Sequence, residues 1–127
     1  MQTFEFLKTV TESDLDALNH VNNVQYVQWV QDIAEKHWLR RATEAILNDY
    51  FWVMLSHHIQ YKQPALLDDT ITIKTYVTNS EGVKSTRIVE FLKGESLLAK
   101  SETNWCFMYK VTLKPTRITD EVKNLFQ

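Results

Sequence analysis

The feature that most constrains the fold is one amphipathic segment, residues 23–41, in a chain that otherwise has mostly strand-like patterns. Apolar side chains recur along this segment at spacings of three and four, which predicts a helix. The apolar face is wide, so we expect a sheet to wrap around this helix. Two parallel rows make up the face: Val27, Val30, Ala34, Trp38 and Arg41, beside Tyr26, Trp29, Ile33 and His37.

The sequence also indicates where this helix begins. Asn22 directly precedes the periodic segment, and Asn is a favoured N-cap residue. Gln25, three positions later, would complete an Asn variant of the capping box. We therefore expect the helix to start at Asn23.

The remaining elements are mostly strands. One strand is expected before the helix, and residues 43–50 should add a helical turn or two after it. Pro64 and the turns at 79–82 and 93–95 then separate four strands that read as a meander. The expected strands are 4–11, 51–62, 69–78, 83–92 and 96–110, and a short helix from 119 to about 126 follows Pro115. Because four strands follow the helix in one block, we expect an α+β fold with a five-stranded, mostly antiparallel sheet around one long central helix.

Length and composition limit the possible classes of function. The 127 residues fit a single domain, 1–127. The net charge is −2 and Lys and Arg are scattered, so we expect no nucleic-acid partner. No apolar run reaches the roughly 18 residues that cross a bilayer. The N-terminus, MQTFEFLKTV, also lacks the regions of a signal peptide, so we expect a cytoplasmic protein without a membrane partner.

The cysteine and histidines do not suggest a metal centre. Cys106 is the single cysteine and lies in a strand-like run between two aromatic residues, so we expect a buried, inert thiol. His57 and His58 are adjacent on an expected strand, and their side chains should point to opposite faces. With four scattered histidines and one cysteine, neither a metal nor a cofactor is expected.

The segment DLDALNHVNNVQY, residues 14–26, concentrates polar groups at the start of the helix. A helix N-terminus carries N–H groups without partners and a partial positive charge, which suit an oxyanion developing on a carbonyl. Asp16 lies close enough upstream to act there as a nucleophile or as a general base for water. Acyl transfer to water is the chemistry that this suggests. The alternative is purely structural, with these residues serving as caps and loop hydrogen-bonding groups, as we expect for Asp14.

This motif resembles the D-x-D-x-x-(G)-H-V-N-N-x-x-Y signature of hotdog-fold acyl-CoA thioesterases of the 4-hydroxybenzoyl-CoA thioesterase-like family. The resemblance extends over essentially the whole chain, including YKQPALLDDTITI at residues 61–73. It implies a hotdog fold and hydrolysis of an acyl-CoA to a carboxylic acid and free coenzyme A. It also implies a homodimer or homotetramer, with sheets joined edge to edge and sites at the subunit interface.

Position by position, the resemblance assigns roles to five residues of this chain. It places the catalytic carboxylate on Asp16 and the carbonyl-polarising backbone N–H on or next to Asn23. His20, Asn22 and Tyr26 match the positions that shape the loop and the mouth of the pocket, so they are expected to bind substrate.

Two positions depart from the family pattern. Asn19 stands where relatives usually have Gly, and Asn tolerates a left-handed backbone better than most residues. Gln31 stands where relatives often carry an acidic residue, and Asp32 follows it. A contribution of a helix carboxylate to water activation is therefore open to question in this chain.

Two other functions stay open at this point. Hotdog folds also host hydratases and dehydratases that act on acyl thioesters, typically with a His and an Asp or Glu placed differently. A non-catalytic subunit that binds acyl thioesters is the other alternative. The acyl group, and its carrier, coenzyme A or acyl-carrier protein, do not follow from the sequence.

Overall fold

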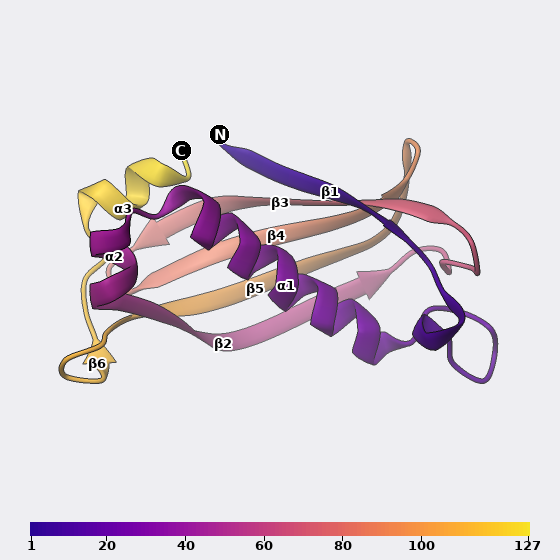
Figure 1. Cartoon of the computed structure of the whole chain (residues 1–127), viewed down its shortest axis with the longest axis horizontal. Coiled ribbons are helices and arrows are strands. Elements are labelled where there is room, and N and C mark those ends of the chain that lie inside the picture. The colour runs from indigo at the N-terminus through magenta and orange to yellow at the C-terminus, as the bar shows by residue number, and fades with distance from the viewer.

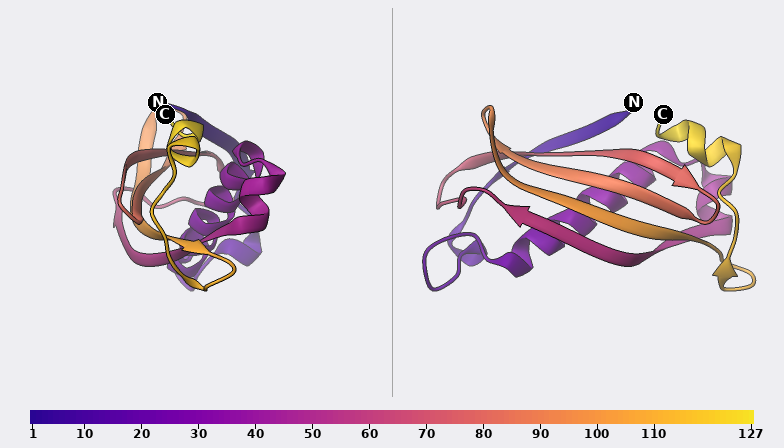
Figure 2. Two further views of the ribbon diagram at one scale, coloured as in Figure 1. Left: turned by 90° about the vertical axis from the view of Figure 1, so that its left-hand side faces the viewer. Right: turned by 180° about the vertical axis from the view of Figure 1, so that it is seen from behind.

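The computed structural model describes all residues, 1–127, and consists of one curved antiparallel sheet with a long helix across its inner face (Figure 1; Figure 2). The helix is α1 (Asn23–Arg41), which has the bounds that the periodicity predicts. The strands are β1 (Thr3–Thr9), β2 (Tyr50–Tyr61), β3 (Thr70–Glu81), β4 (Lys84–Lys93), β5 (Ser96–Tyr109) and the two-residue β6 (Lys114–Pro115). The short helices are η1 (Glu12–Asp14), α2 (Glu44–Asp49) and α3 (Asp120–Leu125).

The strand order corrects the expected four-strand meander. The sheet has the order β1-β3-β4-β5-β2, with β6 paired to β5. Only β3, β4 and β5 follow one another as neighbours, whereas β2 pairs with the far side of β5. The reason is that β1 already pairs with the other edge of β3, from Thr3 opposite Tyr76 to Thr9 opposite Thr70. The chain between β2 and β3 therefore crosses the end of the sheet.

The turn expected at residues 79–82 is also shorter than predicted. β3 continues to Glu81, which pairs with Lys84, and leaves only Gly82 and Val83 in the turn. Gly82 has a φ of +62°, a left-handed conformation that glycine adopts without strain. Ser80, which looks like a turn residue in the sequence, instead lies in the strand, and its hydroxyl is 2.9 Å from the Ser85 hydroxyl.

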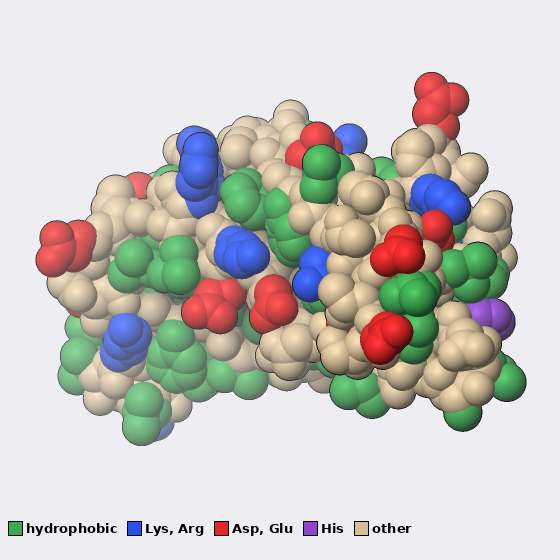
Figure 3. Space-filling view, turned by 45° about the vertical axis from the view of Figure 1, so that its right-hand side comes forward, with side chains coloured by type: hydrophobic (Ala, Val, Ile, Leu, Met, Phe, Trp, Pro, Cys, Tyr) green, Lys and Arg blue, Asp and Glu red, His purple; other side chains and the backbone are tan.

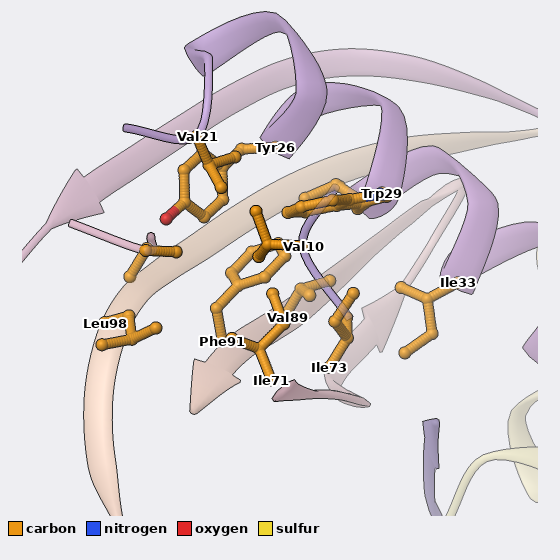
Figure 4. Packing of buried hydrophobic residues seen from close by; sticks show 13 residues of the cluster. Val10, Val21, Tyr26, Trp29, Ile33, Ile71, Ile73, Val89, Phe91 and Leu98 are labelled. Atoms are coloured by element: carbon orange, nitrogen blue, oxygen red, sulfur yellow. The ribbon is translucent and has the colours of Figure 1, made fainter. Parts of the chain in front are cut away.

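The core lies between the buried face of α1 and the inner face of the sheet. Figure 4 shows Tyr26, Trp29 and Ile33 of the helix pointing toward β3 and β4 side chains that include Ile73 and Phe91. Complete burial of one such side chain contributes about 1.5–3 kcal/mol to folding. The face is narrower than expected: Tyr26, Trp29, Val30, Ile33, Ala34 and His37 are buried, Val27 and Trp38 are half-buried, and Arg41 is exposed.

A buried polar group lies beneath the C-terminal half of α1. Nη1 of Arg87, on β4, donates to Nδ1 of His37 at 2.8 Å and to Oγ1 of Thr75 at 3.0 Å. Because Nδ1 of His37 accepts this bond, Nε2 carries the proton and donates to the Gln2 side chain. Burial, with the charges of Arg87 and Arg41, lowers the pKa of His37 to about 3, so the folded protein holds this imidazole neutral.

No helix in the chain combines the length and the apolar character that a membrane-spanning helix requires.

The depressed pKa of His37 predicts a loss of stability on acidification. The unfolded chain protonates this imidazole near pH 6.5, whereas the folded protein does so only near pH 3. Between these values the unfolded state binds more protons, so the free energy of unfolding falls as the pH falls. From about pH 7 to about pH 5, His37 should remove about 2 kcal/mol, at about 1.4 kcal/mol for each pH unit below its unfolded pKa.

Urea unfolding at both pH values measures this effect. His37→Gln keeps an acceptor for Arg87 but has no titrating ring, so its stability should fall less than that of the wild type. His58→Gln, on an exposed part of β2, is the matched control and should behave as the wild type does. Equal losses in the wild type and His37→Gln would show that His37 is not the source.

Candidate active site

The polar segment 14–26 folds at one end of the sheet, opposite the end that carries α2 and α3 (Figure 1). Its first part is a closed turn at η1. The buried carboxylate of Asp14 accepts hydrogen bonds from the backbone N–H of Thr11 at 2.9 Å and from the Thr11 hydroxyl at 3.0 Å. The interpretation of Asp14 as a loop hydrogen-bonding residue is therefore confirmed.

Asp16 organises the next turn around itself. Its backbone N–H donates to the carbonyl of His20 at 2.8 Å, and its Oδ1 accepts from the N–H groups of Leu18 at 2.9 Å and His20 at 3.2 Å. Its second carboxylate oxygen, Oδ2, makes no hydrogen bond within the chain. Asn19 closes the turn with a φ of +61°, the left-handed conformation that its short side chain tolerates. One oxygen of Asp16 is thus fixed by the loop, and the other has no hydrogen-bond partner in the protein.

The start of α1 leaves one backbone donor unpaired. Oδ1 of Asn22 accepts from the N–H of Val24 at 2.9 Å, and the Asn22 carbonyl accepts from Gln25 at 2.9 Å and Tyr26 at 3.3 Å. The N–H of Asn23 has no hydrogen-bond partner in the protein. The helix dipole adds partial positive charge at this position. The N–H of Asn23 is therefore available to an external acceptor.

These bonds confirm Asn22 as the N-cap, but the capping box expected with Gln25 is wrong. The N–H of Asn22 donates to the carbonyl of Asp14 at 2.8 Å. The Gln25 side chain therefore cannot accept from the N–H of Asn22, because this N–H is already bonded to the preceding turn. The same bond ties the turn at η1 to the first turn of α1.

A cavity of about 230 Å³ opens at this helix end. Asp16, His20, Asn23 and Tyr26, four of the five residues that the sequence singled out, all line it. Asn22 is not among the lining residues, because its side chain faces the backbone of the helix. The complete lining is Asp16, His20, Val21, Asn23, Tyr26, Tyr61, Lys62, Gln63 and Pro64.

Sequence reasoning missed the second wall of this cavity, Tyr61 to Pro64. The wall is held against the motif by backbone contacts: Val21 donates to the Ala65 carbonyl at 3.0 Å, and His20 forms an isolated β-bridge with Leu66. The available signal was the segment from Tyr61 that matches the family pattern, but it did not indicate which groups would face Asp16.

Asp69 fixes the far end of this second wall. Its carboxylate accepts from Lys93 Nζ at 2.8 Å and from the Leu66 N–H at 2.9 Å. These hydrogen bonds, with the positive charge of Lys93, hold the pKa of Asp69 below its ordinary value of 3.8. Asp69 is therefore a structural anchor outside the cavity.

Tyr26 forms an aromatic wall inside the cavity. Its ring packs edge-on against Tyr61 at 5.3 Å and Phe91 at 5.0 Å between ring centroids. Burial and the nearby Tyr61 raise the pKa of Tyr26 to about 12, so its hydroxyl stays protonated at neutral pH. Tyr26 can therefore contact a ligand or donate a hydrogen bond, but it does not act as a base at neutral pH.

Asp16 is the only carboxylate that lines this cavity. Asp32 lies outside it, and its carboxylate accepts from Gln28 Nε2 at 2.8 Å. Gln31 lines a different cavity, farther along α1. The acidic helix position of relatives therefore has no counterpart beside Asp16 in this protein.

The remaining candidates lie away from the cavity. Nε2 of His57 is 2.7 Å from the Ser101 hydroxyl, and burial beside His58 lowers its pKa. His58 is exposed, so the two rings face different surroundings, as the strand geometry predicts. Cys106 is free and buried, as expected. No three His, Cys, Asp or Glu side chains converge in a way that could hold a metal ion.

Comparison with solved structures places this architecture among known folds. A 1,4-dihydroxy-2-naphthoyl-CoA thioesterase from Synechocystis superposes with a TM-score of 0.81 at 18% identity, over 98% of this chain and 95% of that one. A probable thioesterase from Escherichia coli gives 0.83 at 19% identity, over 95% and 94%. A hypothetical protein from Staphylococcus aureus, solved in complex with CoA, gives 0.83 at 18% identity, over 98% and 81%. No curated protein sequence matches this chain.

The wrapped sheet and central helix therefore define a hotdog fold, as the sequence predicted. The family model of the Thioesterase-like superfamily matches residues 10–126, and the chain belongs to that superfamily. Membership supports thioester hydrolysis as the general class of reaction.

The N-cap gives a test of how the helix end is built. Asn22→Ala removes the acceptor for the Val24 N–H and should lower the free energy of unfolding by about 1 kcal/mol, as measured by urea unfolding. Asn22→Asp keeps an acceptor oxygen and is the matched control, with stability near the wild type. An alanine variant as stable as the wild type would mean that the cap does not stabilise this helix.

Proposed function

We propose that this protein hydrolyses an acyl-CoA thioester to a carboxylic acid and free coenzyme A at the cavity beside the start of α1. One observation carries the proposal: the unpaired N–H of Asn23 and the carboxylate of Asp16 belong to the same cavity. A backbone donor at a helix N-terminus and one carboxylate are the two groups that this reaction requires.

In the proposed reaction, the N–H of Asn23 donates to the thioester carbonyl oxygen and stabilises the negative charge that develops there. Asp16 then acts through its free Oδ2 in one of two ways. It attacks the carbonyl carbon and forms an acyl-enzyme anhydride that water hydrolyses, or it takes a proton from water as the water attacks. In both, the carbon–sulfur bond breaks, and the sulfur leaves with the electron pair and acquires a proton.

The other lining residues would bind the substrate. His20 and Tyr26 are proposed to contact it at the mouth, and Asn22 supports the site by capping the helix. Lys62 is the one Lys or Arg side chain of the lining and is proposed to meet a phosphate of coenzyme A. On the face drawn in Figure 3, Lys and Arg side chains lie singly among acidic and hydrophobic ones and form no broad basic patch.

The comparisons support a coenzyme A thioester as the substrate class. One structural neighbour is named as a naphthoyl-CoA thioesterase, and another was solved in complex with CoA. Because both are 18% identical to this chain, they show the shared fold alone. Specificity for an acyl-CoA is therefore proposed here.

We further propose that residues 1–127 act as one domain and assemble as a homodimer through β2, or as a homotetramer made of two such dimers. β2 is an edge strand, and Val53, Leu55 and Tyr61 on it are all more than 40% exposed. Pairing with a second β2 would cover this edge and these side chains. Tyr61 also lines the cavity, so a partner on β2 would lie beside the active site.

A cytoplasmic location, suited to the free Cys106, is part of the same proposal.

The carboxylate of Asp16 is the group to test. Asp16→Asn keeps the oxygen that accepts from Leu18 and His20, so the loop should fold normally while hydrolysis falls by at least about 100-fold. Thiol release from a panel of acyl-CoA substrates measures the rate, and circular dichroism measures the fold. Asp32→Asn, a nearby carboxylate outside the cavity, is the matched control and should retain activity.

Each other outcome identifies a different function. Near wild-type hydrolysis by Asp16→Asn would move the catalytic role to another residue. Tight binding of acyl-CoA without turnover across the panel would indicate a non-catalytic binding subunit. Hydration of crotonyl-CoA without thiol release would indicate a hydratase.

A further inference from the structure

A second cavity, of about 270 Å³, is lined by residues from the middle and C-terminal half of α1 and by Val122 of α3. In Figure 1, α3 lies at the end of the sheet opposite the turn that contains Asp16. This cavity has no lining residue in common with the cavity of Asp16. Gln31, its first lining residue on α1, is eight residues beyond Asn23, about 12 Å along the helix axis. The second cavity is therefore a separate site. Eight of its thirteen lining residues are hydrophobic, and five of these are aromatic: Trp38, Phe51, Trp52, Trp105 and Phe126.

The charged group that lines this cavity from the inside is Arg87. Its side chain extends from β4, and the residue is only 7% exposed. The single ion pair of the protein joins Lys93 to Asp69, so no carboxylate of the chain lies within 4.0 Å of the Arg87 guanidinium. The only other charged residue in the lining is Glu35, which is exposed on α1. Arg87 is thus a buried cation without an anionic partner.

Only one nitrogen of this guanidinium is engaged. Nη1 donates to His37 and Thr75, whereas Nε and Nη2 make no hydrogen bond. No fully buried side-chain nitrogen or oxygen in the protein lacks a partner. Nε and Nη2 therefore retain access to open space, and the space beside Arg87 is the cavity that it lines.

The surroundings of Arg87 hold it in place without neutralising it. His37 stays neutral and accepts from Nη1, and Phe126 lies over the guanidinium, 5.6 Å from its carbon to the ring centroid. Burial lowers the pKa of Arg87 to about 10, which still leaves it charged at neutral pH. A buried charge without a partner is unfavourable, and two adjacent N–H donors of a guanidinium match the two oxygens of a carboxylate.

We propose that this cavity binds a small monocarboxylic acid, with its carboxylate on the free N–H groups of Arg87 and its apolar body among the tryptophans. A cavity of about 150 Å³ holds a benzene molecule. The larger volume here suits a ring with a short chain, or a medium aliphatic chain. The exposed carboxylate of Glu35 disfavours ligands with a second negative charge. This site does not depend on the proposed hydrolysis, although that reaction releases acids of the same class.

The test compares an acid with its neutral amide. Calorimetric titration of the full chain with 3-phenylpropionate should show saturable binding. The affinity for 3-phenylpropionamide should be lower by a factor of at least about ten, because the amide lacks the charge. Octanoate and octanamide provide the aliphatic pair. Quenching of tryptophan fluorescence gives a second readout, because three tryptophans line the cavity.

Two variants locate the binding site. Arg87→Met should remove the preference for the acid over the amide, whereas Arg117→Met, an exposed arginine, should leave it unchanged. Ala34→Leu adds side-chain volume inside the cavity while keeping Arg87 itself unchanged, and should weaken both ligands. If Arg87→Met does not fold, acid binding by Ala34→Leu tests whether the acid occupies this cavity. Acid binding by Asp16→Asn tests in the same way whether it occupies the other cavity.

Three results would overturn the proposal: no saturable binding of either acid at millimolar concentration, equal binding of acid and amide by the wild type, or unchanged acid binding in Ala34→Leu. Acid binding that Asp16→Asn weakens and Ala34→Leu does not would assign the acid to the active-site cavity. Acid binding and thioester hydrolysis are measured independently. Ala34→Leu should lose acid binding and keep hydrolysis, so failure of one proposal does not imply failure of the other.

Discussion

The structure depends on the packing of one helix face into one curved sheet. Tyr26, Trp29 and Ile33 of α1 interlock with Ile73 of β3 and Phe91 of β4, and this contact fixes the position and direction of the helix. Both ends of α1 are then placed without further freedom. Its N-terminus meets the polar turn that contains Asp16, and its C-terminal half covers the buried pair of His37 and Arg87. The same hydrophobic contact thus positions both cavities.

The end of the sheet that carries the candidate active site shows how a rigid frame leaves selected groups without partners. The two loops that flank the cavity are joined by the bond from Val21 to Ala65, and Asp69 anchors the second loop through Lys93. Within this frame the side chains of Asp14, Asp16 and Asn22 each accept a hydrogen bond from backbone N–H groups through one oxygen. The Asn23 N–H and Oδ2 of Asp16, both at the cavity, have no partner in the protein. Groups that are held in place and still unpaired can stabilise a developing charge without reorganising, which is the physical basis of the proposed catalysis.

The features that depend on interactions between residues close in the sequence were predicted correctly from local sequence patterns. The bounds of α1, the cap at Asn22 and the left-handed turn at Asn19 follow from periodicity and side-chain preference, and all three are present. The failures have non-local causes. The Gln25 capping box is absent because the carbonyl of Asp14 occupies the N–H of Asn22. The pairing of β2 with β5 depends on β1 occupying the edge of β3, which no single segment encodes.

The candidate sites divide in the same way. The motif brought Asp16, His20, Asn23 and Tyr26 to attention because they lie within eleven consecutive residues, whereas the wall from Tyr61 reaches them only through the fold. Arg87 and His37 are fifty residues apart, and as single letters neither suggests a site. The inference that they form a site depends on their burial in the folded protein. Replacing a buried charge with a well-packed apolar side chain is often neutral or stabilising. A cation enclosed by aromatic rings with two unused donors is therefore better explained by a ligand than by the needs of the core.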